Sequence, residues 1–114
     1  MGKKLPIPEA VLELMADKFR MLGDSTRLAI LNSLMMGGEL NVSEVVVATN
    51  RNTANVSKHL KQLAASGLLA RRKEGSFVLY RLNDPVVERI CELMCDSLRS
   101  EIESQLKLNR LLDQ

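Results

Sequence analysis

The sequence has little of what several protein classes need. It contains a single histidine, no Trp, one Tyr and two Phe. The sequence has no glycine-rich phosphate loop, and its single histidine forms no Ser/His/Asp or Cys/His set at a spacing typical of catalysis. We therefore do not expect an enzyme. No apolar run approaches the roughly 18–20 residues of a membrane span, and the N-terminus lacks the apolar core of a signal peptide. We therefore expect a cytoplasmic protein with no membrane partner.

Cysteine is equally scarce, because Cys91 and Cys95 are the only two in the chain. Two cysteines four residues apart do not make a disulfide scaffold, and a cytosolic protein keeps its thiols reduced. The 114 residues are 46% hydrophobic and 26% charged, which is ordinary for a folded protein. They predict one domain over residues 1–114, small enough for dimerisation to help its core.

Positive charge is concentrated in one third of the chain. The net charge is only +2. From Arg51 to Arg81, however, there are seven basic residues and one acid, Glu74, so this segment carries 7 − 1 = +6. The remainder of the chain then carries 2 − 6 = −4. A concentration of this kind is typical of a surface that binds nucleic-acid phosphates.

Inside the basic segment, the pattern predicts a helix that begins at Asn52, a good N-cap, and is ended by Gly67. Val56, Leu60 and Leu63 recur at helical spacing and form an apolar stripe. Short polar side chains and lysines point away from that stripe, and they suit the edges and phosphates of a DNA major groove. Taken alone, the segment is more typical of a solvated amphipathic helix.

The segment before this helix supports the DNA-binding interpretation. Asn41-Val42-Ser43-Glu44 has the form of a capping box and predicts a short helix through Ala48. A turn at residues 49–51 then leads into the second helix, which is the helix-turn-helix pattern. The valine run at 45–47 could instead form a buried strand, but the capping box favours a helix.

After Gly67 the hydrophobic period changes to two. Leu69–Lys73 and Phe77–Leu82 are predicted strands, joined by Glu74-Gly75-Ser76 in a hairpin. A basic hairpin could be an edge made soluble by charge. Directly after a helix-turn-helix, it is better interpreted as a wing that lies along the DNA backbone.

Amphipathic helices flank this region. The apolar spacing predicts a first helix over 8–22, a second from Asp24 or Ser25 to about Met36, and a last helix over 85–110 that begins with Asp84-Pro85. The long apolar stripe of the last helix indicates a partner helix, most economically from a second copy related by a two-fold axis. Such a dimer would place two recognition helices about 34 Å apart, one turn of DNA.

Over roughly residues 14–98 the chain resembles the ArsR/SmtB family of bacterial winged-helix repressors. The resemblance rests on residues 22–31, on 39–44, on 55–63 with Ser66-Gly67-Leu68, and on the wing from Arg71 to Leu82. It implies a mostly α winged helix-turn-helix of five helices and a two-stranded wing, with a homodimer through the first and last helices. It also implies repression of a double-stranded DNA operator until an inducer binds. The dimer residues implied are Val11, Met15, Ile90, Met94, Leu98 and Ile102.

The chain departs from the family where many members sense metals. A Cys-x-Cys pair opens the third helix of many members, but Asn41 and Ser43 stand there. Zinc-type members carry Asp-x-His on the last helix, but here Asp84 is present, Val86 stands where the histidine belongs, and no histidine follows. Sulfide- and peroxide-responsive members carry a cysteine where this chain has Asn32.

Cys91 and Cys95 remain as the candidate sensor. On a helix the two thiols share one face at about 6 Å, which suits chelation of a soft ion such as As(III) or Cd(II), completed across a dimer axis. A redox switch and simple packing as small apolar residues stay open as alternatives.

The expected function is a DNA-binding transcriptional repressor, and the alternative from another class is a winged-helix module that binds proteins instead of DNA. The residues expected to contact DNA are Arg51, Asn52, Thr53, Asn55, Ser57, Lys58, His59 and Lys61, with Arg71, Arg72 and Lys73 in the wing.

Overall fold

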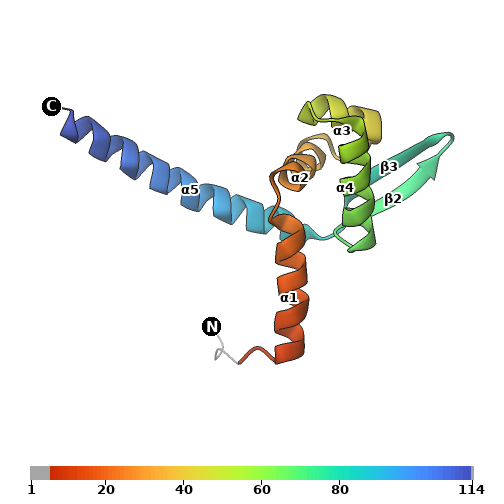
Figure 1. The fold of residues 1–114 in the computed structure, drawn as a ribbon, viewed down its shortest axis with the longest axis horizontal. Coiled ribbons are helices and arrows are strands. Elements are labelled where there is room, and N and C mark those ends of the chain that lie inside the picture. The colour runs from red at the N-terminus through yellow and green to blue at the C-terminus, as the bar shows by residue number, and fades with distance from the viewer. Residues whose placement is uncertain (1–5, 114) are drawn as a thin grey trace. The chain divides into compact units, whose positions relative to one another are not determined.

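The computed structural model describes residues 6–113, and the chain divides after Asn83 into two compact units. The first unit holds four helices and a small sheet among its described residues, and the second is one long helix (Figure 1). None of the described helices is long and apolar enough to cross a membrane. In chain order the elements are α1 (Glu9–Leu22), α2 (Ser25–Gly37), β1 (Leu40–Asn41), α3 (Val42–Thr49), α4 (Thr53–Ala65), β2 (Leu69–Glu74), β3 (Phe77–Leu82) and α5 (Pro85–Leu112).

Side-chain caps set the starts of four helices, as the sequence predicted for each. Asn41 and Glu44 form a complete capping box at α3, where each side chain bonds the other residue's backbone N–H at 2.9 Å. Asp24 caps α2, Asn52 caps α4 and Asp84 caps α5, each by accepting from a backbone N–H of the first turn. These acceptors satisfy donors that have no partner inside the helix. The valine run is therefore helical, and the strand alternative for it is wrong.

The sheet has one strand more than predicted. Its order is β1-β3-β2, with Leu40 opposite Tyr80 and Asn41 opposite Leu79. β1 is two residues long, too short to show an alternating pattern, which is why the expected wing had two strands. The hairpin turn is also tighter than expected. Glu74 pairs with Phe77, so Gly75 and Ser76 alone make the connection, with Gly75 at φ +62°.

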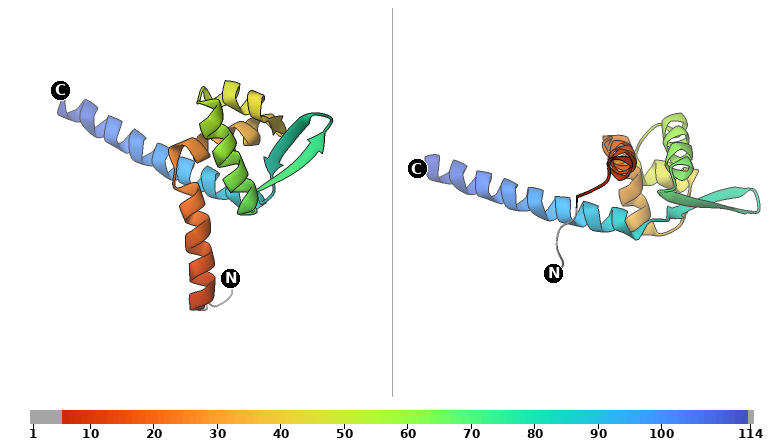
Figure 2. Two further views of the ribbon diagram at one scale, coloured as in Figure 1. Left: turned by 45° about the vertical axis from the view of Figure 1, so that its right-hand side comes forward. Right: turned by 90° about the horizontal axis from the view of Figure 1, so that it is seen from below.

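The core of the first unit forms where α2, α3 and α4 meet the base of the sheet. Figures 1 and 2 show these helices beside the hairpin, whose tip extends past them. The predicted stripe of α4 is fully buried. The buried apolar side chains of the unit are Leu22, Ile30, Leu31, Leu34, Val45, Val56, Leu60, Leu63, Leu68, Leu69 and Tyr80.

The apolar stripe of α1 is not part of this core. In α1 only Leu22 is buried, while Val11, Met15 and Phe19 are exposed. Leu28 of α2 is exposed as well. Helical spacing identifies an apolar face, but it does not say whether the same chain covers that face.

Leu60→Ala tests the core of the first unit. Leu60 is fully buried, so we expect the change to lower the free energy of unfolding by about 2–5 kcal/mol through lost burial and a residual cavity. Val47, which is 82% exposed on α3, provides the matched control: Val47→Ala should change it by less than about 0.5 kcal/mol. Urea unfolding followed by circular dichroism measures both, and equal effects would contradict this core.

Candidate nucleic-acid interface

A tight turn joins α3 to α4. Asn50 follows α3 in the left-handed conformation, at φ +51°, and its backbone N–H bonds the carbonyl of Val46. The half-buried Arg51 donates from Nη1 to the carbonyl oxygen of Thr49 at 3.1 Å. Asn50 tolerates this conformation better than most residues because its short side chain is polar. The predicted helix, turn and second helix are thus present between Val42 and Ala65.

Burial of the apolar stripe leaves a polar face of α4 exposed. Thr53, Asn55, Lys58 and Lys61 are exposed, and Ser57 is half-buried at the edge of this face. Amide, hydroxyl and ammonium groups at these positions can donate to base edges or phosphate oxygens. The α4 start also presents free backbone N–H groups, which favour an anion.

Asn52 has a structural role that the expected list of DNA contacts did not separate. Its Oδ1 accepts from the backbone N–H of Asn55 at 3.1 Å, which caps α4. Asn55 is exposed, and its side chain has no hydrogen bond with another described residue. Asn52 therefore stabilises the helix start, whereas Asn55 is available to a ligand.

His59 lies at the flank of the buried stripe. The residue is half-buried, and its Nδ1 is enclosed without a hydrogen-bond partner among the described residues. It is close enough to Asp24 to help lower the pKa of that carboxyl, although the hydrogen bond from the backbone N–H of Arg27 is the larger cause. This placement limits how much of the imidazole can reach DNA.

Arg27 is a residue that the sequence analysis did not single out. Its guanidinium donates to the carbonyl oxygen of Arg20 in α1 and to Oε1 of Gln62 in α4, both at 3.4 Å. Its Nε is buried and has no partner among the described residues. Arg27 therefore connects the end of α1 with the exposed side of α4. A pattern of arginines in sequence carries no signal for such a bridge.

The three basic residues of the wing do not lie on one face. Arg71 pairs with Tyr80 and Lys73 with Val78 across the hairpin, so both lie on the face that is buried at its base. Both are exposed, and neither has a hydrogen bond or ion pair with another described residue. Arg72 lies on the opposite face.

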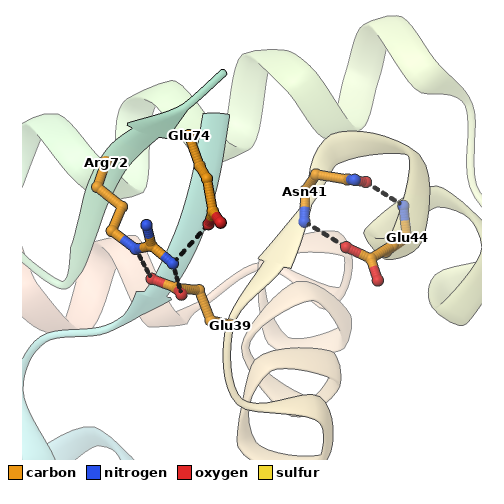
Figure 3. A network of polar contacts seen from close by, with 5 residues as sticks. All are labelled: Glu39, Asn41, Glu44, Arg72 and Glu74. Atoms are coloured by element: carbon orange, nitrogen blue, oxygen red, sulfur yellow. Dashed lines mark hydrogen bonds and ion pairs between the residues drawn. The ribbon is translucent and has the colours of Figure 1, made fainter. Parts of the chain in front are cut away.

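Two carboxylates hold Arg72 (Figure 3). Its Nε donates to Oε2 of Glu39 at 2.8 Å and its Nη2 to Oε1 of the same residue at 2.6 Å. Nη2 also lies 2.8 Å from Oε2 of Glu74. The bond from Arg72 is the main reason why the pKa of Glu39 is lowered, and Glu39 is the main reason why the pKa of Arg72 is raised.

The two thiols lie one helical turn apart on α5. Cys91 is half-buried, and burial raises the pKa of its thiol. Cys95 is exposed, and Nη2 of Arg99 lies 3.7 Å from its Sγ. Within residues 6–113, no three His, Cys, Asp or Glu side chains gather as a metal site. One chain therefore offers a soft ion two donors at most in this region, and further donors must come from elsewhere.

Comparison with known sequences supports the family resemblance. Residues 24–71 match the profile described as "Bacterial regulatory protein, arsR family". An arsenical resistance operon repressor of Escherichia coli is 36% identical over 75% of this chain and 73% of its own length. A cadmium resistance transcriptional regulatory protein of Staphylococcus aureus, described as a CadC homolog, is 39% identical over 68% of this chain and 64% of its own length.

Solved structures show the same fold. The AntR antimony-specific transcriptional repressor superposes with a TM-score of 0.82 at 27% identity, covering 90% of this chain and 93% of its own. A homodimeric winged helix-turn-helix DNA-binding domain from Mycobacterium bovis gives 0.70 at 29% identity, covering 87% and 91%. The expected winged helix-turn-helix is thereby confirmed.

Asn52→Ala and Asn55→Ala should separate capping from DNA contact. We expect Asn52→Ala to lower the free energy of unfolding by about 1 kcal/mol, because α4 loses its cap. Asn55→Ala should leave stability nearly unchanged and reduce discrimination at one base pair of the DNA site. Urea unfolding and binding to a set of single-substitution DNA duplexes measure the two effects. If Asn55→Ala weakens binding to every duplex by the same factor, the result would contradict a contact between Asn55 and a base.

Proposed function

The chain belongs to the ArsR family of bacterial DNA-binding transcriptional regulators, and on that premise we propose a homodimeric repressor that an inducer releases from its operator. The observation that carries the proposal is the exposed polar face of α4. Burial of the apolar stripe of α4 fixes this face, and the capped helix α3 and a tight turn precede it. The surrounding segment, residues 51–81, carries +6 by the count of seven basic residues and one acid. A protein-interaction module would need no such charge.

In this proposal α4 enters the major groove. Asn55, Ser57 and Thr53 contact base edges, with Lys58 and Lys61 near phosphates. Arg51 lies at the helix entry, where a phosphate would meet the start of α4. Arg71 and Lys73 contact the flanking backbone or the minor groove. Asn52 and His59 contribute mainly through the helix start and the packed flank of α4.

A second copy of the chain would cover the apolar faces of α1 and α5. The side chains concerned are large and, apart from the half-buried Ile90, exposed. Met94 and Ile102 are each 58% exposed. An exposed apolar stripe on each of these two helices is typical of a partner interface, and a two-fold axis would duplicate α4 for two successive half-sites. The proposed interface residues are Val11, Met15, Ile90, Met94, Leu98 and Ile102.

We propose a thiophilic metal or metalloid ion as the inducer, bound through Cys91 and Cys95. Relatives of this chain are named for arsenical and cadmium resistance and for antimony. All three elements favour thiolate ligands. Since one chain supplies two such donors on α5, the second copy would supply the others. The raised pKa of Cys91 opposes thiolate formation in the free protein, so binding should release a proton and weaken as the pH falls.

Lys58→Ala tests contact with DNA. We expect weaker binding to the DNA upstream of the chain's own gene, and a salt slope reduced by about one ion because one phosphate contact is lost. Fluorescence anisotropy at several salt concentrations measures the slope. Lys18→Ala on α1 is the matched control and should leave the slope unchanged. Lost affinity at an unchanged slope would argue against a phosphate contact, and no binding by the wild type at low salt would favour the interaction module.

A double substitution, Cys91→Ser with Cys95→Ser, tests the inducer. Operator binding is titrated with arsenite, antimonite, cadmium, zinc or an oxidant. For the wild type we expect a thiophilic ion to weaken binding, together with ultraviolet absorption from sulfur–cadmium bonds when cadmium is added. The double variant should lose both effects and keep its basal affinity. A response equal to that of the wild type would mean that the thiols only pack, and a response to the oxidant alone would indicate a redox switch.

A further inference from the structure

We propose that Glu39, Arg72 and Glu74 form a latch that positions the wing for DNA, and that Arg72 acts through this latch and not as a phosphate contact. The inference rests on the DNA-binding role proposed above and divides the wing's basic residues into two groups. Arg71 and Lys73 would contact DNA, and Arg72 would hold the strand that presents them.

The geometry of Arg72 fits a structural role. Its planar guanidinium engages Glu39 through two parallel bonds, from Nε at 2.8 Å and from Nη2 at 2.6 Å. Glu74 adds a contact to Nη2 at 2.8 Å. Bidentate pairs of this kind are stronger and more directional than single contacts. A DNA phosphate would have to displace two carboxylates to reach the same nitrogens.

The latch spans the sheet. Glu39 directly precedes β1, Arg72 lies on β2, and β3 runs between these two outer strands. Arg72 pairs with Leu79, and Leu79 pairs in turn with Asn41. The ion pair therefore joins two strands that share no backbone hydrogen bonds, on the face of the sheet opposite the core.

This restraint matters because the hairpin beyond the end of β1 has only two strands. β1 pairs at Tyr80 and Leu79 and no farther, and an isolated two-stranded ribbon twists easily. Two residues after Glu39, Asn41 caps α3 through the reciprocal bonds with Glu44 (Figure 3). A short, fixed stretch of backbone therefore connects the latch of the wing to the first helix of the helix-turn-helix.

The charges agree with this division. Arg81 pairs with Ala70 and so lies on the same face of the wing as Arg72. Arg72 and Arg81 with Glu39 and Glu74 sum to 2 − 2 = 0, so the latch face of the wing carries no net positive charge to attract DNA. Arg71 and Lys73 lie on the other face without carboxylate partners among residues 6–113. Their positive charge is uncompensated, as phosphate binding requires.

A double-mutant cycle tests the latch, because the sign of the coupling differs between the two roles of Arg72. The proteins are the full-length wild type, Glu39→Gln, Arg72→Gln and the double variant, each bound to the duplex from upstream of the chain's own gene. Removal of the Glu39 charge alters long-range attraction to DNA equally with and without Arg72, so this general effect cancels in the cycle.

We expect Arg72→Gln to weaken binding roughly fivefold, as the loss of a bidentate pair would, with the salt slope unchanged. In that variant Glu39→Gln should cost no further affinity beyond the general charge effect. In the wild type, the effect of Glu39→Gln on DNA affinity should be less favourable than its effect in Arg72→Gln, again by roughly fivefold. The adjacent change Arg71→Gln is the matched control: it removes the same charge from the opposite face and should lower the slope by about one ion.

The opposite coupling would overturn the latch. If Glu39→Gln strengthens binding more in the wild type than in Arg72→Gln, the carboxylate competes with DNA for Arg72. A slope lowered by Arg72→Gln as much as by Arg71→Gln would overturn it as well. Both results require a wild type that binds DNA, so they are distinct from failure of the proposed function, in which the wild type itself does not bind.

Discussion

Burial of Val56, Leu60 and Leu63 is the constraint on which the rest of the structure depends. These side chains fix the rotation of α4 about its own axis, because each is fully enclosed by the core that α2, α3 and the sheet base complete. At about 100° per residue, that rotation decides what every other position of the helix can do. Asn55 and Lys58 become exposed, whereas His59 is drawn into the flank of the core.

The polar residues at the starts of α3 and α4 have a structural role as helix caps. Asn52 caps α4 and Asn41 caps α3. Asn41 is also the position at which the family resemblance led us to expect the first cysteine of a Cys-x-Cys pair. Its amide serves the helix start, and no soft donor replaces it there. The proposed inducer site therefore rests on the thiols of α5, since thiophilic ions prefer sulfur ligands.

The small size of the core explains the apolar surface left on α1 and α5. A small chain encloses a limited number of side chains, and those of the first unit are supplied mainly by α2, α3, α4 and the sheet. Helix α5 adds a long stripe with large exposed side chains such as Met94 and Ile102. The proposed dimer would remove such surface from water, because a two-fold interface buries the same residues on both copies.

The sequence by itself determined the elements whose physical causes are local. Caps at Asp24, Asn41, Asn52 and Asp84, helical spacing in α4 and strand alternation around Gly75 each act within a few residues, so the helices and the hairpin could be predicted. Only the tertiary structure decided what depends on residues far apart in the chain. Three such contacts join segments more than 30 residues apart: the pairing of β1 with β3, the bond of Arg27 to Gln62, and the ion pair of Arg72 with Glu39. Arg27 also bonds Arg20 in a separate helix, α1. A run of arginines in sequence shows charge, but the fold determines which of those charges is already paired.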